Sequence, residues 1–350
     1  MRRPEFIQHL FIQSKDFLTV KVIIALKKRK LDFENIHFPL EDIPLLRRQF
    51  FTLKLILFNE NKEIISQHLF DTDSFGQAVL RIPLQKKHCI NLIRCFETAY
   101  SPGVEFLLGD FYPLRIETPS KIVISDFDKT LINTSYSGIL DVITSLVNPI
   151  DYFPSIENGL DLFKSYIKKD YVPFVLSASP HFYEATIHTW LWQQDLRSCS
   201  LFLKDYRQSF SLSDGLLAPK DLWTQGLYKL DQLLDLLIMC SLPDEIVLLG
   251  DDFESDPMIY LTLSQIITNT GEPFRLWQKI IENPSFKFSK KQKAKLLSKI
   301  YEISSFLYDK KKQGYSLPKI SIFIRKTKKT ISPPSELETA LQNKISYHSF

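Results

Sequence analysis

The first 118 residues contain short apolar runs that are separated by polar breaks. Five of these runs have the length of β-strands: 17–27, 50–58, 63–70, 77–84 and 89–96. Strands at this spacing, with turn residues between them, are typical of a small antiparallel sandwich. Leu53, Leu55 and Leu57 alternate with Lys54, Ile56 and Phe58. The face opposite the three leucines therefore contains apolar as well as polar residues. We therefore expect an all-β, sandwich-like domain over residues 1–118.

The pattern changes after residue 118, where continuous apolar runs alternate with segments of helical periodicity. The runs 121–124, 171–176 and 245–249 are expected to be strands buried on both faces, as in parallel sheets. Helical spacing of apolar residues is clearest at 157–169 and 226–238. This alternation predicts an α/β domain over 119–328. Within it we expect a basic helical insertion at about 275–318 and a last strand at 320–324, with 329–350 as a C-terminal tail.

Composition narrows the class of protein. Apolar residues make up 44% of the chain and charged residues 24%, which are values of a globular protein. We find no apolar run long enough to span a bilayer and no secretory signal. Four cysteines, Cys89, Cys95, Cys199 and Cys240, lack metal-ligand spacing, and we expect reduced thiols that are mostly buried. These features predict a cytoplasmic protein, and 350 residues are enough for two domains.

The net charge of +4 hides a local excess of positive charge. Residues 279–329 contain fifteen lysines and arginines against three acidic residues, so this segment carries +12 and the rest of the chain −8. Such a segment is either a solvated helix face or a contact for an anionic membrane surface, and the sequence leaves both open. We see no stacking-and-groove pattern that would indicate a nucleic-acid partner.

A pair of carboxylates follows the first strand of the α/β domain. Asp126 and Asp128 belong to the pattern D-x-D-x-T, which ends at Thr130. Side chains two residues apart on an extended chain point the same way, so both carboxylates should meet at the carboxyl end of the strand. Ligands of open α/β sheets bind at that edge. Two adjacent carboxylates predict a hard divalent cation such as Mg²⁺.

Further polar groups stand at the ends of the next two strands. Ser177 is a candidate phosphate ligand, although a serine here can also cap the following helix, which is the role we expect for Ser179. After the strand 245–249, Gly250 lets the backbone approach closely and Asp251 follows at once, as a metal site requires. The same loop also carries Asp252 and Asp256.

These motifs, in this order, resemble those of the haloacid dehalogenase superfamily of Mg²⁺-dependent phosphotransferases. VISDFDKTLINT, PFVLSASPHFYEATIHTWL, LFLKD, YKLDQLLDLL and IVLLGDDFESDPMIY are similar to the catalytic domain of the actin-patch phosphatidate phosphatase family. The D-P-x-I-Y ending at Tyr260 is the most specific part. The resemblance covers residues 118–265, and it implies a Rossmann-like, parallel-sheet haloacid dehalogenase domain behind the small all-β sandwich.

The resemblance also implies roles for individual residues. Asp126 would be the nucleophile that forms an aspartyl phosphate, and Asp128 the general acid and base. Ser177 and Lys229 would complete the catalytic set by holding phosphoryl oxygens. The candidate metal ligands are Asp126, Asp128, Asp251, Asp252 and Asp256. The candidate substrate-binding residues are Thr130, Ser177, Ser179 and Lys204.

The function expected from these residues is Mg²⁺-dependent hydrolysis of a phosphomonoester lipid such as phosphatidate. The protein would be cytoplasmic, with peripheral contact to membranes through residues 279–329. Two alternatives stay open at this point. One is a phosphatase of soluble phosphomonoesters, and the other is a catalytically silent module that binds lipid or protein on the same scaffold.

Overall fold

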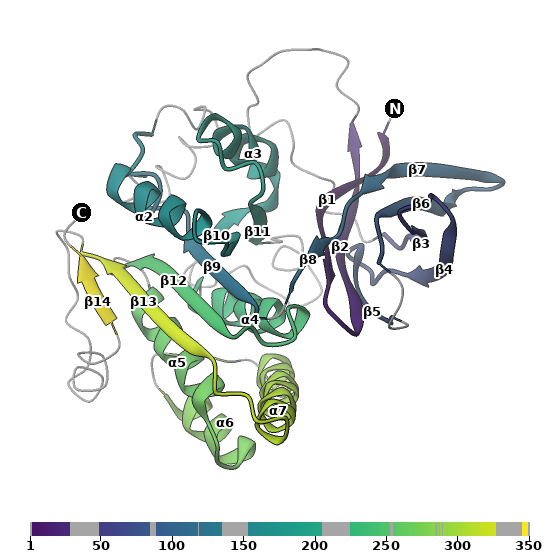
Figure 1. Ribbon diagram of the computed structural model, residues 1–350. Helices are drawn as coiled ribbons and strands as arrows, with labels where there is room; N and C mark the ends of the chain where they lie inside the picture. Colours follow the sequence, from purple (N-terminus) through teal and green to yellow (C-terminus); the bar gives the residue numbers. More distant parts are fainter. Residues whose placement is uncertain are drawn as a thin grey trace.

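The structure is a computed structural model that describes residues 2–28, 49–84, 89–117, 119–134, 153–204, 225–252, 255–283, 286, 288, 290–326 and 345–348. Two four-stranded sheets, largely antiparallel, form the N-terminal part. A six-stranded parallel sheet with helices on both faces forms the rest (Figure 1). The chain is therefore a mixed α/β protein with a β-rich N-terminal part, as the apolar pattern predicts.

The N-terminal strands divide into two sheets. The first has the order β5-β2-β1-β8, and the second has the order β4-β3-β6-β7. Their bounds are β1 (Arg2–Gln13), β2 (Phe17–Lys28), β3 (Thr52–Phe58), β4 (Ile64–Asp71), β5 (Gln77–Pro83), β6 (Leu92–Ser101), β7 (Val104–Phe111) and β8 (Leu114–Arg115). Neighbours in both sheets pair antiparallel, except that β8 lies parallel to β1.

The two N-terminal sheets pack face to face around one apolar core. Leu53, Leu55 and Leu57 of β3 are fully buried there together with Val20 and Val22 of β2. The alternation read from β3 thus marks its inward face. The packing of two sheets with interleaved side chains is that of a sandwich, with the polar residues of β3 turned away from the core.

The strand β1 was not expected, and its burial explains why. The other face of its sheet packs against the α/β part, where Leu10 and Ile12 join a core made mostly of residues from that part. Gln8 is also buried and donates from Nε2 to the Leu201 carbonyl at 3.1 Å. A strand covered on both faces shows no alternation of apolar and polar residues, so the period-2 signal is missing.

The parallel sheet has the order β11-β10-β9-β12-β13-β14. Its strands are β9 (Lys121–Asp126), β10 (Val172–Pro180), β11 (Ser200–Lys204), β12 (Glu245–Asp251), β13 (Lys319–Arg325) and β14 (Ile345–His348). Every neighbouring pair is parallel. The chain moves outward from β9 to β11 on one side and then from β12 to β14 on the other. The strand order therefore reverses between β9 and β12.

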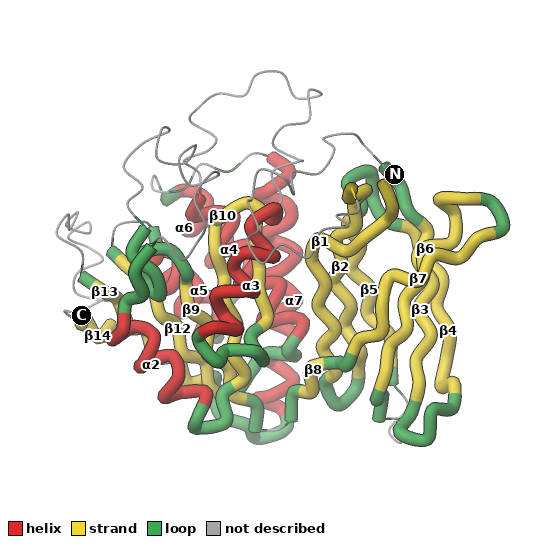
Figure 2. Tube along the Cα trace, turned by 90° about the horizontal axis from the view of Figure 1, so that it is seen from above, coloured by secondary structure: helices red, strands yellow, loops and turns green. Residues whose placement is uncertain are grey.

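Helices cover both faces of this sheet. They are α2 (Glu157–Ile167), the short η3 (His181–Tyr183), α3 (Glu184–Gln193), α4 (Gln225–Met239), α5 (Asp256–Thr268), α6 (Pro273–Glu282) and α7 (Lys290–Lys312). Ile122 and Ile124 of β9 pack toward α4, α5 and α7, whereas Val123 packs toward α2 and α3. Figure 1 shows α2 and α3 on one side of the strands and α4 to α7 on the other, and Figure 2 looks onto the sheet from the side of α2 and α3. Burial on both faces is why β9 reads as a continuous apolar run.

The C-terminal part differs from the expectation in one respect. Residues 345–348, within the segment expected to be a tail, form β14 and pair with β13 at the edge of the sheet. Residues 329–344 lie outside the described part. The expected last strand at 320–324 is present as β13, after the helices α6 and α7. Among the described residues, no helix has both the length and the apolar character needed to cross a membrane.

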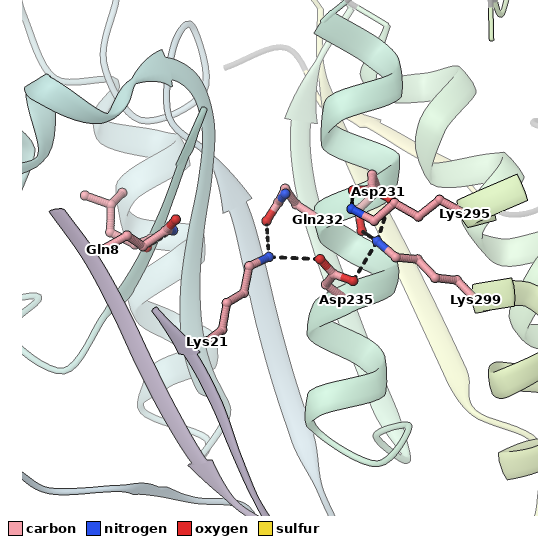
Figure 3. Close-up of polar contacts among 8 residues, drawn as sticks. Gln8, Lys21, Asp231, Gln232, Asp235, Lys295 and Lys299 are labelled. Atoms are coloured by element: carbon pink, nitrogen blue, oxygen red, sulfur yellow. Dashed lines mark hydrogen bonds and ion pairs between the residues drawn. The ribbon is translucent and has the colours of Figure 1, made fainter. Parts of the chain in front are cut away.

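A network of buried charges joins the two parts of the molecule (Figure 3). Lys21 of β2 is buried, and its Nζ lies 2.5 Å from Gln232 Oε1 and 2.9 Å from Asp235 Oδ2 on α4. From the other side of α4, Lys299 of α7 lies 2.6 Å from Asp235 and 2.5 Å from Asp231. Lys295 adds a further ion pair to Asp231 at 2.8 Å. Helix α4 is thus held by the N-terminal sheet on one side and by α7 on the other.

Some lysines of the basic segment 279–329 form ion pairs within the protein. Lys295 and Lys299 bind α4, and Lys310 lies 2.5 Å from Asp244. Lys299 is 7% exposed. At least these lysines serve internal contacts, so the segment 279–329 is not a uniform surface of free positive charge.

Candidate active site

The acidic motifs meet where the strand order of the parallel sheet reverses. Asp126 is the last residue of β9, and Asp251 is the last residue of β12, which pairs with β9. The crevice outside the carboxyl ends of strands at such a reversal is where open α/β sheets bind their ligands. The two carboxylates therefore lie at the position that the topology favours for a site.

Three carboxylates come together there. Asp126, Asp251 and Asp256 are buried, and one oxygen from each lies within 4.8 Å of the others. Asp256 begins α5, where the positive end of the helix dipole favours a negative charge. Gly250 makes the approach possible, because a Cβ at this position would lie 2.6 Å from Asp256 Oδ2 and 2.8 Å from Tyr260 Cε2. Any larger residue at position 250 would push Asp256 away.

Lys229 binds two of these carboxylates. It comes from α4, is 1% exposed, and places Nζ 2.8 Å from Asp126 Oδ1 and 2.7 Å from Asp256 Oδ1. With all groups ionised, three carboxylates and one ammonium carry a formal charge of −2. One hard divalent cation offsets this charge and prefers oxygen ligands of this kind. The residues present therefore fit a Mg²⁺ ion.

Asp128 lies in a second polar group. Ser177 Oγ and Ser179 Oγ each donate to Asp128 Oδ2 at 3.0 Å, and the Ser179 amide donates to Ser177 Oγ at 2.9 Å. Thr130 Oγ1 donates to Asp126 Oδ2 at 3.2 Å. The hydroxyl groups that we expected to contact substrate therefore hold the two carboxylates of D-x-D-x-T in this structure.

The remaining predicted residues lie at the same edge of the sheet. Lys204 ends β11, is 8% exposed and stands opposite Pro180 in the β10–β11 pairing. Asp252 follows β12 and is 7% exposed. Within the described ranges, the three-carboxylate group that would hold a metal consists of Asp126, Asp251 and Asp256. The other two candidate ligands stay predictions, because Asp128 was expected to bind through its backbone carbonyl and Asp252 to orient the waters of the ion.

Two residues make contacts near the site that the sequence analysis did not predict. Tyr260 donates from its hydroxyl to the carbonyl of Leu249, the residue before Gly250, at 2.9 Å. Burial, and then the negative charge of Asp256, raise the pKa of Tyr260 well above its ordinary value, so this phenol stays neutral. Arg325, the last residue of β13, donates from a guanidinium nitrogen to the Lys129 carbonyl at 2.7 Å. Tyr260 belongs to the motif that carried the resemblance, and Arg325 directly follows the strand expected at 320–324, although we assigned it no role.

The part of the chain that forms this site can be compared with known families. Residues 121–270 match the family model of the catalytic domain of the phosphatidate phosphatase APP1. This confirms the resemblance that the motifs predicted. The match to the APP1 catalytic domain begins with β9 and ends just after α5, so it contains Asp126, Lys229, Asp251 and Asp256. It supports a phosphatase, which is a hydrolase of phosphorylated substrates.

Whole-chain comparisons add little. A search of curated proteins finds no match. Solved structures with some likeness include β-glucuronidases of Parabacteroides merdae (11% identity, TM-score 0.29, 93% of this chain and 34% of that one) and Bacteroides uniformis (9%, 0.32, 99% and 37%). A β-glucuronidase of Ruminococcus gnavus gives 8% identity and a TM-score of 0.26, with 99% and 54% covered. The chain thus spans only about a third to a half of these proteins, and likeness at such TM-scores carries no conclusion.

Proposed function

We propose that this chain is a Mg²⁺-dependent phosphatase of the haloacid dehalogenase type, with a Rossmann-like catalytic sheet and an aspartyl-phosphate intermediate on Asp126. We further propose that its substrate is a phosphomonoester lipid such as phosphatidate. The observation that carries the proposal is the buried set of Asp126, Asp251, Asp256 and Lys229 at the reversal of strand order, inside a segment that matches a phosphatase family.

The metal would be held by Asp126, Asp251 and Asp256, whose oxygens already lie close together. When bound, Mg²⁺ would offset negative charge on the phosphoryl oxygens. The Lys229 ammonium would also offset negative charge at this position. Because its ammonium contacts Asp126, it reduces the repulsion between a carboxylate nucleophile and an anionic phosphate.

The chemistry needs two residues of the first motif. A carboxylate oxygen of Asp126 attacks phosphorus, and the bond from phosphorus to the leaving oxygen breaks. Asp128, in its protonated form, gives its proton to that leaving oxygen. Asp128 then takes a proton from water, which attacks phosphorus and releases inorganic phosphate from Asp126. Ser177 and Ser179 hold the Asp128 carboxylate in place for both proton transfers.

A lipid substrate requires contact with a membrane, and we propose that a cytoplasmic form of this protein binds the membrane surface peripherally. The exposed lysine Lys290 begins α7, and Lys311 and Lys312 end it. Each basic residue near an anionic surface contributes about 1 kcal/mol to docking, so a few would suffice for reversible contact. The lysines that bind α4 and Asp244 are not available for this contact.

The test is phosphate release from phosphatidate in vesicles, lysophosphatidate and soluble phosphomonoesters, each with Mg²⁺ and with EDTA. We expect release from the phosphatidate vesicles, its loss in EDTA and its loss in Asp126→Asn. Asp110→Asn makes the same chemical change at an ion pair with Arg94 in the N-terminal part and should keep full activity. Turnover of the soluble esters alone would replace the lipid by a soluble substrate. Release that survives EDTA or Asp126→Asn would overturn the mechanism.

A further inference from the structure

Arg325 contacts both acidic loops of the candidate site. Its guanidinium donates to the carbonyl of Lys129, which lies between Asp128 and Thr130. Its own backbone carbonyl accepts from the Asp252 amide at 3.1 Å. In the register of β12 and β13, Arg325 stands opposite Asp251. One residue therefore touches the chain that follows β9 and the chain that follows β12.

This contact crosses the sheet. Strand β12 lies between β9 and β13, so the side chain of Arg325 must pass over the end of β12 to reach Lys129. Neighbouring strands are about 4.8 Å apart, so the span is about 10 Å, which an extended arginine covers. Arg325 lies outside the segment 121–270 that matches the phosphatase family. The site thus draws on a strand beyond that segment.

Hydrogen bonds within the loop's own backbone also shape the turn that Arg325 contacts. The amides of Leu131 and Ile132 donate to the Phe127 carbonyl, and the Lys129 amide donates to the Ile132 carbonyl at 2.7 Å. Gly159 of α2 lies so close to the Thr130 carbonyl that a Cβ would be 2.3 Å from it. The Lys129 carbonyl, in contrast, is held by the distant Arg325 side chain.

Lys129 has an unusual conformation. Its φ of 60° lies in the left-handed region, which a residue with a Cβ rarely adopts. Such a conformation persists where the surrounding structure holds it, and it often occurs at functional sites. The peptide on the N-terminal side of Lys129 belongs to Asp128. A change at Lys129 would therefore redirect Asp128 first and Asp126 next.

We infer that Arg325 is a positioning residue that locks the left-handed turn at Lys129 and thereby sets the directions of Asp126 and Asp128. Its effect on catalysis rests on the proposed function, but the contact itself does not. A displacement of about 1 Å in a reacting group can reduce a rate about 100-fold. Arg325 acts through the loop, so its loss should lower kcat and leave KM nearly unchanged.

The first measurement compares Arg325→Gln and Arg325→Lys with the native protein in the phosphate-release assay. We expect kcat to fall about 100-fold in Arg325→Gln and less in Arg325→Lys, with KM within about threefold. Added methylguanidine should restore part of the kcat of Arg325→Gln. Arg115→Gln is the matched control, because Arg115 also donates to a backbone carbonyl, that of Ile90, in the N-terminal part. It should leave kcat unchanged.

The second measurement is independent of activity. Amide hydrogen exchange at Lys129 and Ile132 should be at least about tenfold faster in Arg325→Gln and unchanged in Arg115→Gln. If the native protein releases no phosphate from any substrate, the proposed function fails, while faster exchange still supports the lock. Unchanged exchange overturns the inference, whether or not kcat falls. A raised KM with native kcat also overturns it, because that result would indicate direct contact with substrate.

Discussion

Two buried lysines, one on α4 and one that reaches α4 from the N-terminal sheet, have different partners. Lys229, 1% exposed, points from α4 to the carboxylates Asp126 and Asp256. Lys21, 3% exposed, reaches α4 from the N-terminal sheet and binds Gln232 and Asp235 (Figure 3). Both ammonium groups are removed from water and satisfied by oxygen atoms, as buried charges must be.

The charge balance around the two lysines is opposite. Lys229 binds two of three clustered carboxylates, so this group carries a formal charge of −2. Lys21 belongs to a network with Lys295 and Lys299 against two carboxylates, Asp231 and Asp235. The network therefore has one positive charge in excess. The site therefore carries a formal excess of negative charge, whereas the junction does not.

The largest expected difference is in activity. Lys229→Met removes the cation beside the proposed nucleophile, and we expect phosphate release to fall by about 10³-fold. Lys21→Met makes the same chemical change at the junction and should retain activity within about threefold. Rates of phosphate release under saturating substrate decide this. Equal losses in the two variants would contradict the division of tasks between the lysines.

The next difference is in stability. Lys21→Met leaves Asp235 with Lys299 but without its second cation, and we expect the free energy of unfolding to fall by about 3 kcal/mol. The control is Lys54→Met, which breaks an ion pair with Glu105 at the surface and should cost less than about 1 kcal/mol. Urea unfolding of both variants measures these values. A loss below 1 kcal/mol in Lys21→Met would show that the junction depends on apolar packing alone.

Magnesium should have different effects through the site carboxylates and through the carboxylates of the junction. If the site carboxylates bind Mg²⁺, a concentration 100 times the Kd raises the free energy of unfolding by about 2.7 kcal/mol. Asp251→Asn should lose this stabilisation, while Asp235→Asn should keep it. Unfolding with and without Mg²⁺ provides the comparison. Stabilisation that survives in Asp251→Asn would place the ion elsewhere.

The smallest effect concerns acid. Burial opposes the charged form of Asp235, but Lys21 and Lys299 outweigh it and hold its pKa well below the ordinary value of 3.8. Because the folded pKa is the lower one, this stabilisation is present above pH 3.8 and is lost as the pH falls below it. Asp235→Asn should therefore be less stable at neutral pH and show a shallower decline below pH 4. Urea unfolding between pH 3 and 7 measures both slopes, and parallel curves would refute the role of Asp235.

The burial of the cysteine thiols could be predicted from the sequence. Cys95, Cys199 and Cys240 are buried, and Cys89 is half-buried, with all four free. Burial raises the pKa of the Cys199 thiol to about 12. Such a thiol has little thiolate at neutral pH and is inert. A small apolar side chain without metal-ligand spacing was enough to predict this.

The sequence by itself determined the elements that depend on local pattern. The run 121–124 predicts a buried strand because three of its four residues, Ile122, Val123 and Ile124, are apolar, and Asp126 follows directly at the carboxyl end of that strand. The same logic places Asp251 at the end of β12. These predictions succeed because burial and side-chain direction repeat along the chain with fixed periods.

Only the tertiary structure decided which distant residues meet. Lys229 binds Asp126 across 103 positions of the sequence, and Arg325 reaches Lys129 across 196. Lys21 lies in a strand covered on both faces, where no alternation marks its side. The sequence pattern indicates which residues are buried, but it does not indicate which distant residue binds a buried charged side chain. That choice depends on how strands and helices pack, and for Lys21 and Lys229 the packing of α4 between two sheets and α7 makes it.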